Sequence, residues 1–138
     1  MKQLLKYFVL FGVGGLIYIG LELFCRGHTH WTMFLLGGVC FICLGLINEV
    51  LPWETPLLLQ MIIGGTVITT LELLTGYIVN IKLGWAVWDY STLPFNFMGQ
   101  ICLSFSLLWC LLSAVGIVLD DWLRYWWFKE EKPHYRLF

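Results

Sequence analysis

The sequence predicts an all-α membrane protein with four transmembrane helices, arranged as two parallel-repeat hairpins, plus a C-terminal interfacial helix. Three observations indicate this class. Of the 138 residues, 59% are hydrophobic and only 12% are charged, about half the charged share of a soluble domain. Four apolar runs approach the roughly 20 residues that a helix needs to cross a bilayer. Aromatic residues reach 17%, with eight tryptophans, which is typical of the belts at the two membrane interfaces.

The apolar runs define the predicted helices. They lie at about 4–25, 31–47, 56–79 and 95–119. The runs are continuous rather than alternating, which excludes a closed barrel, and an open sheet in lipid would leave backbone groups unpaired. The first run follows Lys2 and Lys6 but reaches Glu22 without a small-residue cleavage site. We therefore interpret it as a retained helix rather than a signal peptide.

The distribution of basic residues predicts the orientation. With a cytoplasmic N-terminus, six of the eight Lys and Arg residues lie inside, and only Arg26 and Lys82 lie outside. This excess predicts an integral protein of the plasma (cytoplasmic) membrane with the N- and C-termini inside. The loops at 26–31 and 85–96 would then both face outward. The net charge of -1 offers no basic surface for nucleic acid, so the lipid bilayer is the expected partner.

A short internal repeat relates the two halves of the chain. A Gly-Gly pair followed by Leu-Glu-Leu occurs at 14–23 and again, with the same spacing, at 64–73. A second match joins GGVC at 37–40 to GQIC at 99–102. Each copy contains two spans, so the copies would be parallel and related by a pseudo-twofold axis along the membrane normal.

This repeat sets the predicted domain organisation. The four-helix transmembrane domain covers 1–119, with repeat 1 at about 7–50 and repeat 2 at about 57–119. The tail at 120–138 mixes charged residues with tryptophan and tyrosine, which favours a juxtamembrane amphipathic helix. A helix that docks a partner is the alternative for this segment.

Two carboxylates, Glu22 and Glu72, lie within the apolar runs. A carboxylate at the bilayer centre costs on the order of 3 kcal/mol, so it marks either function or a buried structural pair. Arg26 lies four residues after Glu22 on the same helical face, which makes a structural ion pair a direct alternative there. Glu72 has no basic residue at that spacing, so its partner must come from another element.

The two outer loops supply the remaining candidates. In the first loop His28 and His30 form a His-x-His pair, but a metal site needs three or four ligands, so neither a metal nor a cofactor is expected. Capping of the following helix is the alternative role for His30. In the second loop Asn96 and Gln100 would lie one turn apart on the fourth helix, either as an interhelical clamp or as ligand contacts.

Because both loops lie on one side in this topology, they predict a polar pocket near the outer face with aromatic walls. Such a pocket suits a cationic or amphipathic ligand. No catalytic residue is assigned. The candidate ligand or transport residues are Glu22, Arg26, His28, His30, Trp31, Glu72, Trp88, Asp89, Tyr90, Asn96 and Gln100.

Several strings within these segments resemble a known family. They are RGHTHW at 26–31, LELLTG at 71–76, WDYS at 88–91, PFN at 94–96 and GQIC at 99–102. Together they resemble the putative type IV ABC-transporter family of CmpB-like membrane proteins over most of residues 14–115. The resemblance implies a permease-like membrane protein. No Walker A pattern occurs, so any ATPase, or another membrane subunit, would be a separate chain.

The expected function is therefore binding or transport of a small cationic or amphipathic substrate through the outer pocket. Four helices make a thin wall for a pathway, so a homo-oligomer is expected. A non-catalytic membrane scaffold or partner subunit is the first alternative, and a membrane-embedded lipid-modifying enzyme is the second. In the enzyme, acid–base chemistry would come from His28, His30, Asp89 and the two glutamates, Glu22 and Glu72. No nucleophile–base spacing is recognisable, so an enzyme is the least favoured of the three.

Overall fold

The computed structural model describes residues 1–137 and contains, among them, four helices that are long and apolar enough to cross a membrane. The elements are α1 (Lys2–Arg26), α2 (Trp31–Val50), α3 (Leu57–Gly76), the π-helix η1 (Tyr77–Lys82), β1 (Asn96–Phe97), β2 (Ile101–Cys102) and α4 (Leu103–Phe128). The predicted all-α membrane class with four transmembrane helices is confirmed. The chain is an integral membrane protein.

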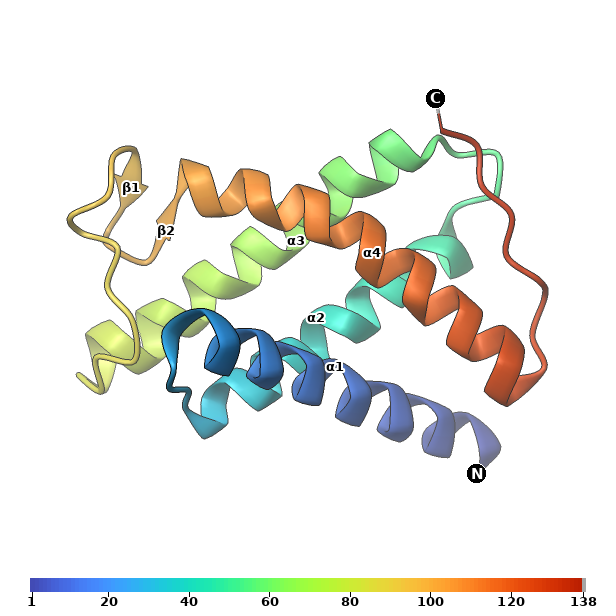
Figure 1. Cartoon of the computed structure of the whole chain (residues 1–138), viewed down its shortest axis with the longest axis horizontal. Helices are drawn as coiled ribbons and strands as arrows, with labels where there is room; N and C mark the ends of the chain where they lie inside the picture. The colour runs from blue at the N-terminus through green and yellow to red at the C-terminus, as the bar shows by residue number, and fades with distance from the viewer. Residues whose placement is uncertain (138) are drawn as a thin grey trace.

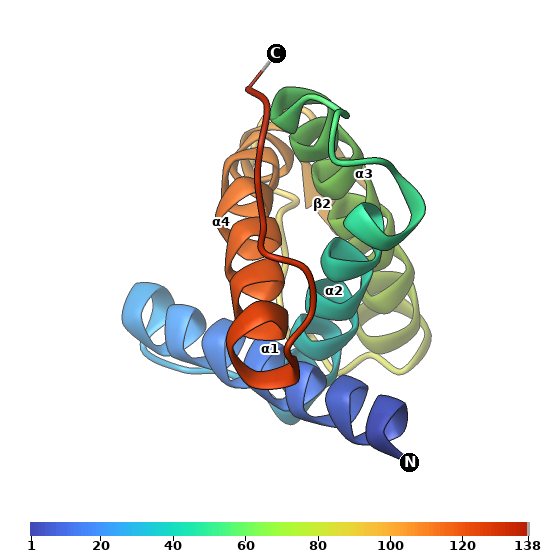
Figure 2. The ribbon, with the colours of Figure 1, turned by 90° about the vertical axis from the view of Figure 1, so that its right-hand side faces the viewer.

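The helices form two antiparallel hairpins, α1 with α2 and α3 with α4. The loops after α1 and after η1 lie at one end of the bundle, and the N-terminus and the α2–α3 turn lie at the other (Figure 1). We call these the loop end and the terminal end. Helix α1 crosses the other three helices at an angle (Figure 2) and packs chiefly on α2. Since α1 and α3 run in the same direction, the fold has the geometry that parallel repeats require, while the duplication itself stays a prediction.

The Gly-Gly pair of each predicted repeat lies where its hairpin is most closely packed. A Cβ atom on Gly14 of α1 would approach the backbone oxygen of Gly37 in α2 to 2.9 Å. A Cβ atom on Gly65 of α3 would lie 2.9 Å from the Cα atom of Cys110 in α4. Small residues allow helices to approach this closely in a membrane, where dispersion contacts rather than water drive association.

The second loop is longer than predicted, and α4 begins at Leu103 instead of near 95. The predicted placement of Asn96 and Gln100 on one helical face is therefore wrong, because Asn96 lies in β1 and Gln100 lies in the turn between β1 and β2. The Asn96 side chain donates to the backbone oxygens of Ser91 and Leu93. Such local bonds compete with helix formation, and Gly99 with its φ of 71° completes the turn.

The C-terminal segment also differs from its predicted form. Helix α4 runs without interruption to Phe128, so the boundary predicted at 119/120 lies inside it, and no separate interfacial helix follows within residues 129–137. The helix ends at Lys129, which adopts a left-handed conformation with a φ of 56°. The tail then crosses the terminal end (Figure 2). There the backbone oxygen of Arg136 accepts from Leu57 at the start of α3 at 2.6 Å.

Candidate functional site

Glu72 is the most deeply buried carboxylate at the loop end, with 2% of its surface exposed. The sequence did not identify the hydrogen-bond partner of Glu72, and the structure shows two uncharged donors. Trp109 Nε1 of α4 donates to Oε1 at 3.2 Å, and the Tyr90 hydroxyl of the second loop donates to Oε2 at 3.1 Å. Both carboxyl oxygens therefore accept, and within residues 1–137 no Lys or Arg forms an ion pair with Glu72.

Aromatic rings surround this carboxylate. Tyr90 stacks on Phe105, with the ring centroids 4.9 Å apart and the planes 10° from parallel. Tyr18 of α1 lies 6.1 Å from Trp109, centroid to centroid. Burial, followed by the nearby carboxylate of Glu72, raises the pKa of the Tyr90 hydroxyl well above its ordinary value. The hydroxyl therefore keeps its proton and remains a donor.

Glu22 and Arg26 form a pair that joins the two loops. Arg26 Nη1 lies 2.8 Å from Glu22 Oε2, and its Nη2 donates to the backbone oxygen of Val87 at 3.0 Å. The ring centroids of His30 and Trp85 are 5.7 Å apart. The structure thus brings the two loops together, as predicted, and gives Glu22 and Arg26 a structural contact.

Gln100 and Trp88 anchor the second loop against η1. Trp88 Nε1 donates to the backbone oxygen of Gln100 at 3.0 Å, and Asn80 Nδ2 donates to Gln100 Oε1 at 2.7 Å. Asn80 Oδ1 in turn accepts from the backbone nitrogen of Val87 at 2.7 Å. Sequence reasoning missed Asn80, although it is an amide in the last apolar turn before the loop. These amides satisfy one another, so they act as a clamp rather than as ligand contacts.

The other predicted residues serve their own loops or face outward. His30 Nδ1 accepts from the backbone nitrogen of Thr32 at 3.3 Å, so its predicted capping role is confirmed. Trp31 and His28 are exposed. Asn96, described above, braces the second loop.

Asp89 is exposed and does not join Glu72. Its Oδ1 accepts from the backbone nitrogen of Ser91 at 2.9 Å. This bond lowers the pKa of the Asp89 carboxyl from its ordinary value, since it stabilises the charged form. No set of three or more His, Cys, Asp or Glu side chains in residues 1–137 is arranged to hold a metal.

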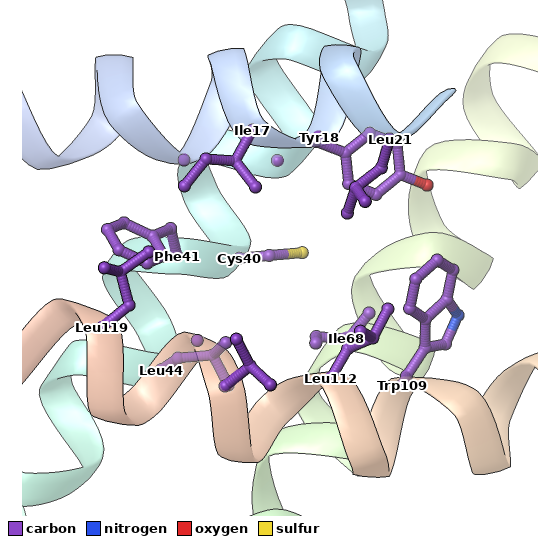
Figure 3. A pocket seen from close by; sticks show the side chains of 14 residues that line it. Ile17, Tyr18, Leu21, Cys40, Phe41, Leu44, Ile68, Trp109, Leu112 and Leu119 are labelled. Carbon is purple, nitrogen blue, oxygen red and sulfur yellow. The ribbon is translucent and has the colours of Figure 1, made fainter. Parts of the chain in front are cut away.

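An apolar pocket of about 120 Å³ opens beside Glu72, between α1 and α4. Tyr18 from α1, Cys40 from α2 and Leu112 from α4 face into it (Figure 3). Trp109 closes one end of the pocket (Figure 3), and its indole nitrogen is the donor to Glu72. A buried carboxylate thus lies one hydrogen bond behind the pocket wall.

The pocket borders the lipid. Val115, which lines it, is 63% exposed on α4. Because α1 packs chiefly on α2 and crosses α4 at an angle (Figure 2), close helix packing does not seal this side of the bundle. The pocket therefore opens on the surface of α4 within one of the four helices that could cross a membrane.

A second polar cluster lies at the terminal end, where sequence reasoning expected a surface helix. Asp120, Asp121, Arg124 and Lys6 are all buried. Arg124 Nε lies 2.7 Å from Asp120 Oδ2, and Lys6 Nζ lies 3.0 Å from Glu130 Oε2. The spacing of Asp120 and Arg124 at i and i+4 was the available signal, but this spacing suits an exposed helix equally well.

Comparisons with known proteins agree with this description. The sequence model of a family described as "Putative ABC-transporter type IV" matches residues 4–130, a range that includes nearly all of α1 and the whole of α2, α3 and α4. No curated protein and no solved structure matches the chain. The match covers nearly the whole sequence and confirms the resemblance predicted above. It also supports a transport-related role in the membrane. The chain therefore belongs to the family described as putative ABC-transporter type IV.

Proposed function

We propose that this permease-like protein binds a small amphipathic molecule in the pocket between α1 and α4. The apolar part of the ligand lies against Leu112 and Val115, and its polar or cationic head is directed toward Glu72. One observation carries this proposal: Trp109 lines a lipid-facing pocket and at the same time donates to a buried carboxylate.

The polar end of this pocket provides the selectivity. In a bilayer the alkyl part of any ligand gains little by leaving lipid for an apolar wall, because both surroundings are hydrocarbon. A charged head gains more, since electrostatic attraction is strong where water is excluded. The faces of Tyr18 and Trp109 add cation–π attraction for an ammonium head. A cationic amphiphile is therefore favoured over a neutral or anionic one.

This proposal keeps some of the predicted site residues but moves the ligand pocket from the outer loops to the space between α1 and α4. Glu72 and Tyr90 remain as a hydrogen-bonded pair behind the pocket, and Trp88 and Gln100 anchor the second loop. Asp89 belongs to the surface of that loop. The route to the ligand runs from the lipid through the α1–α4 opening.

The assembly forms part of the same proposal. Four helices enclose only a small pocket, so we retain the homo-oligomer as the transporting unit. The family description supports an ATPase on a separate chain as the energy source.

Photolabelling with a diazirine-tagged dodecylammonium tests the polar end of the pocket, and a tagged dodecanol is the neutral probe. Glu72→Gln removes the charge but keeps an acceptor. We expect it to reduce ammonium labelling about tenfold, which corresponds to ~1.4 kcal/mol of lost charge-assisted interaction. Dodecanol labelling should change little. Equal ammonium labelling of the wild type and Glu72→Gln would contradict the proposal.

A matched pair of variants tests the location. Val115 and Leu111 are both on α4, with 63% and 62% of their surfaces exposed, but only Val115 lines the pocket. Val115→Trp should block the opening and reduce labelling by both probes, while Leu111→Trp should leave it unchanged. Circular dichroism melts of each variant separate lost binding from lost folding.

A further inference from the structure

The terminal-end cluster surrounds a second cavity of about 130 Å³, separate from the α1–α4 pocket. Its walls come from α2, the α2–α3 turn, α4 and the tail. The charged residues in its lining are Glu49, Asp121, Arg124, Glu130 and Glu131. Four carboxylates thus face the same small space as one guanidinium.

Arg124 has an unused donor in this cavity. The residue is only 3% exposed; its Nε pairs with Asp120 and its Nη1 with Glu49. Its Nη2 has no hydrogen-bond partner among the described residues. A buried charged donor that lacks a partner is costly, so this atom indicates a missing acceptor.

Gly45 of α2 packs closely against this guanidinium. A Cβ atom on Gly45, which lines the cavity, would lie 2.7 Å from Arg124 Nη2. The Asp120 carboxylate would lie closer still, at 2.2 Å, so only a glycine fits at this position. The same cavity has an unused acceptor. Asn48 Oδ1 is buried and lacks a donor within residues 1–137, although Asn48 Nδ2 donates to Asp121. Two residues that line the cavity, Arg124 and Asn48, thus carry an unused donor and an unused acceptor.

We propose that this cavity is a binding site for a small zwitterionic group. The anionic oxygen of the ligand accepts from Arg124 Nη2, and its ammonium donates to Asn48 Oδ1 and to the carboxylates of Asp121 and Glu131. An anion alone would be repelled by the four lining carboxylates. A cation alone would leave Arg124 Nη2 without an acceptor. A group that carries both charges satisfies both sets.

The tail forms the outer wall of this site. Tyr135 donates to Asp121 Oδ2 at 2.8 Å, and Trp53 Nε1 donates to Glu131 Oε2 at 3.0 Å. The cavity also lies at the ends of α2 and α4, the level at which headgroups meet a transmembrane bundle. Its zwitterion is therefore either the headgroup of an ethanolamine-type lipid or a free solute with the same chemistry.

Isothermal titration of the full-length protein in detergent tests the site with phosphoethanolamine, ethanolamine and inorganic phosphate. We expect phosphoethanolamine to bind at least about tenfold more tightly than either half. Glu131→Gln, an exposed position that tolerates change, should weaken this binding about tenfold. Glu54→Gln is the control, since Glu54 is an exposed glutamate in the α2–α3 turn that does not line the cavity. Arg124→Lys should reduce phosphoethanolamine binding to the level of ethanolamine.

Nanodiscs distinguish the two sources of the zwitterion. If the lipid is the source, native mass spectrometry will find phosphatidylethanolamine, but not phosphatidylglycerol, retained by the wild type and lost from Glu131→Gln. If a free solute is the source, phosphoethanolamine will bind equally to the protein in nanodiscs of phosphatidylethanolamine and in nanodiscs of phosphatidylglycerol. Phosphoethanolamine binding no tighter than that of its halves, or equal binding by the Glu131→Gln and Glu54→Gln proteins, would overturn the proposal.

Discussion

Removing the Tyr90 hydroxyl isolates one of the two bonds that hold Glu72. Tyr90→Phe deletes the 3.1 Å bond to Oε2 and keeps the ring stacked on Phe105. A hydrogen bond to a charged group contributes about 1.5–3 kcal/mol and a neutral one about 0.5–1.5 kcal/mol, although interhelical polar contacts in membranes average nearer ~0.6 kcal/mol. We therefore expect Tyr90→Phe to lower the free energy of unfolding by about 1–2 kcal/mol.

A double-mutant cycle assigns this loss to Glu72. In a Glu72→Gln background the donor meets an uncharged amide, so Tyr90→Phe should cost less than ~1 kcal/mol, with a coupling energy of about 1 kcal/mol. The assay is reversible unfolding in mixed micelles, followed by circular dichroism. Tyr77→Phe is the matched control, because the Tyr77 hydroxyl makes no hydrogen bond to any described residue.

Additive single and double variants, within about 0.3 kcal/mol, would refute the reasoning. They would mean that Tyr90 stabilises the fold through its ring alone, and that Glu72 is held by other groups.

Three further predictions follow from the packing, the tyrosines and the tail. Gly65→Ala places a methyl group 2.2 Å from a sulfur atom of α4 and should destabilise the protein by about 1–3 kcal/mol, whereas Gly12→Ala meets nothing within 4 Å and should stabilise it by up to ~1 kcal/mol. Burial raises the pKa of Tyr90 and of Tyr135 in the folded protein. Their contribution to stability is therefore complete below the pKa of an unfolded tyrosine, about 10, and is lost as the pH rises toward the pKa of each tyrosine in the folded protein. Absorbance near 295 nm should show that both hydroxyls ionise only on unfolding. Deleting residues 129–138 removes two backbone bonds to α3, the Tyr135 bond to α4, and the contacts of Lys6 with Glu130 and of Trp53 with Glu131. The loss should be at least about 3 kcal/mol, as measured by the same micelle assay.

Each of these predictions has a contrary result. Equal melting behaviour of the two alanine variants would show that the glycine contact does not limit the approach of α3 and α4. Early ionisation of Tyr90 at pH 10 in the folded protein would show that its hydroxyl is exposed. An unchanged melt after removal of the tail would show that the tail is not docked on the bundle.

The sequence allowed the spans and their mutual direction to be predicted, because hydropathy is a local property that each run carries by itself. The two loops could be predicted to lie on the same side, because the chain crosses the membrane twice between them. The start of α4 could not be predicted in the same way. There the Asn96 side chain bonds to nearby backbone, and this local competition is invisible in an apolar pattern that continues through the segment.

The site around Glu72 depends on contacts between elements that are far apart in the sequence, and the spacing of residues along the chain does not reveal such contacts. Glu72 was identified from its cost in lipid, but Trp109 and Tyr18 resembled ordinary aromatic residues of apolar helices. The terminal-end cluster was missed for a related reason. Charges near the end of a span suit an exposed helix, and only the packing of α1, α2 and the tail around Arg124 buries them.

The most direct test of the α1–α4 pocket is the position of the photolabel in the wild-type protein. After labelling with diazirine-tagged dodecylammonium in nanodiscs, peptide mass spectrometry should find the adducts concentrated at 17–21 of α1 and 112–119 of α4, on the walls of the pocket. Adducts spread evenly over the lipid-facing residues of all four helices, including exposed positions of α3 such as Leu58 and Ile62, would contradict the proposed site.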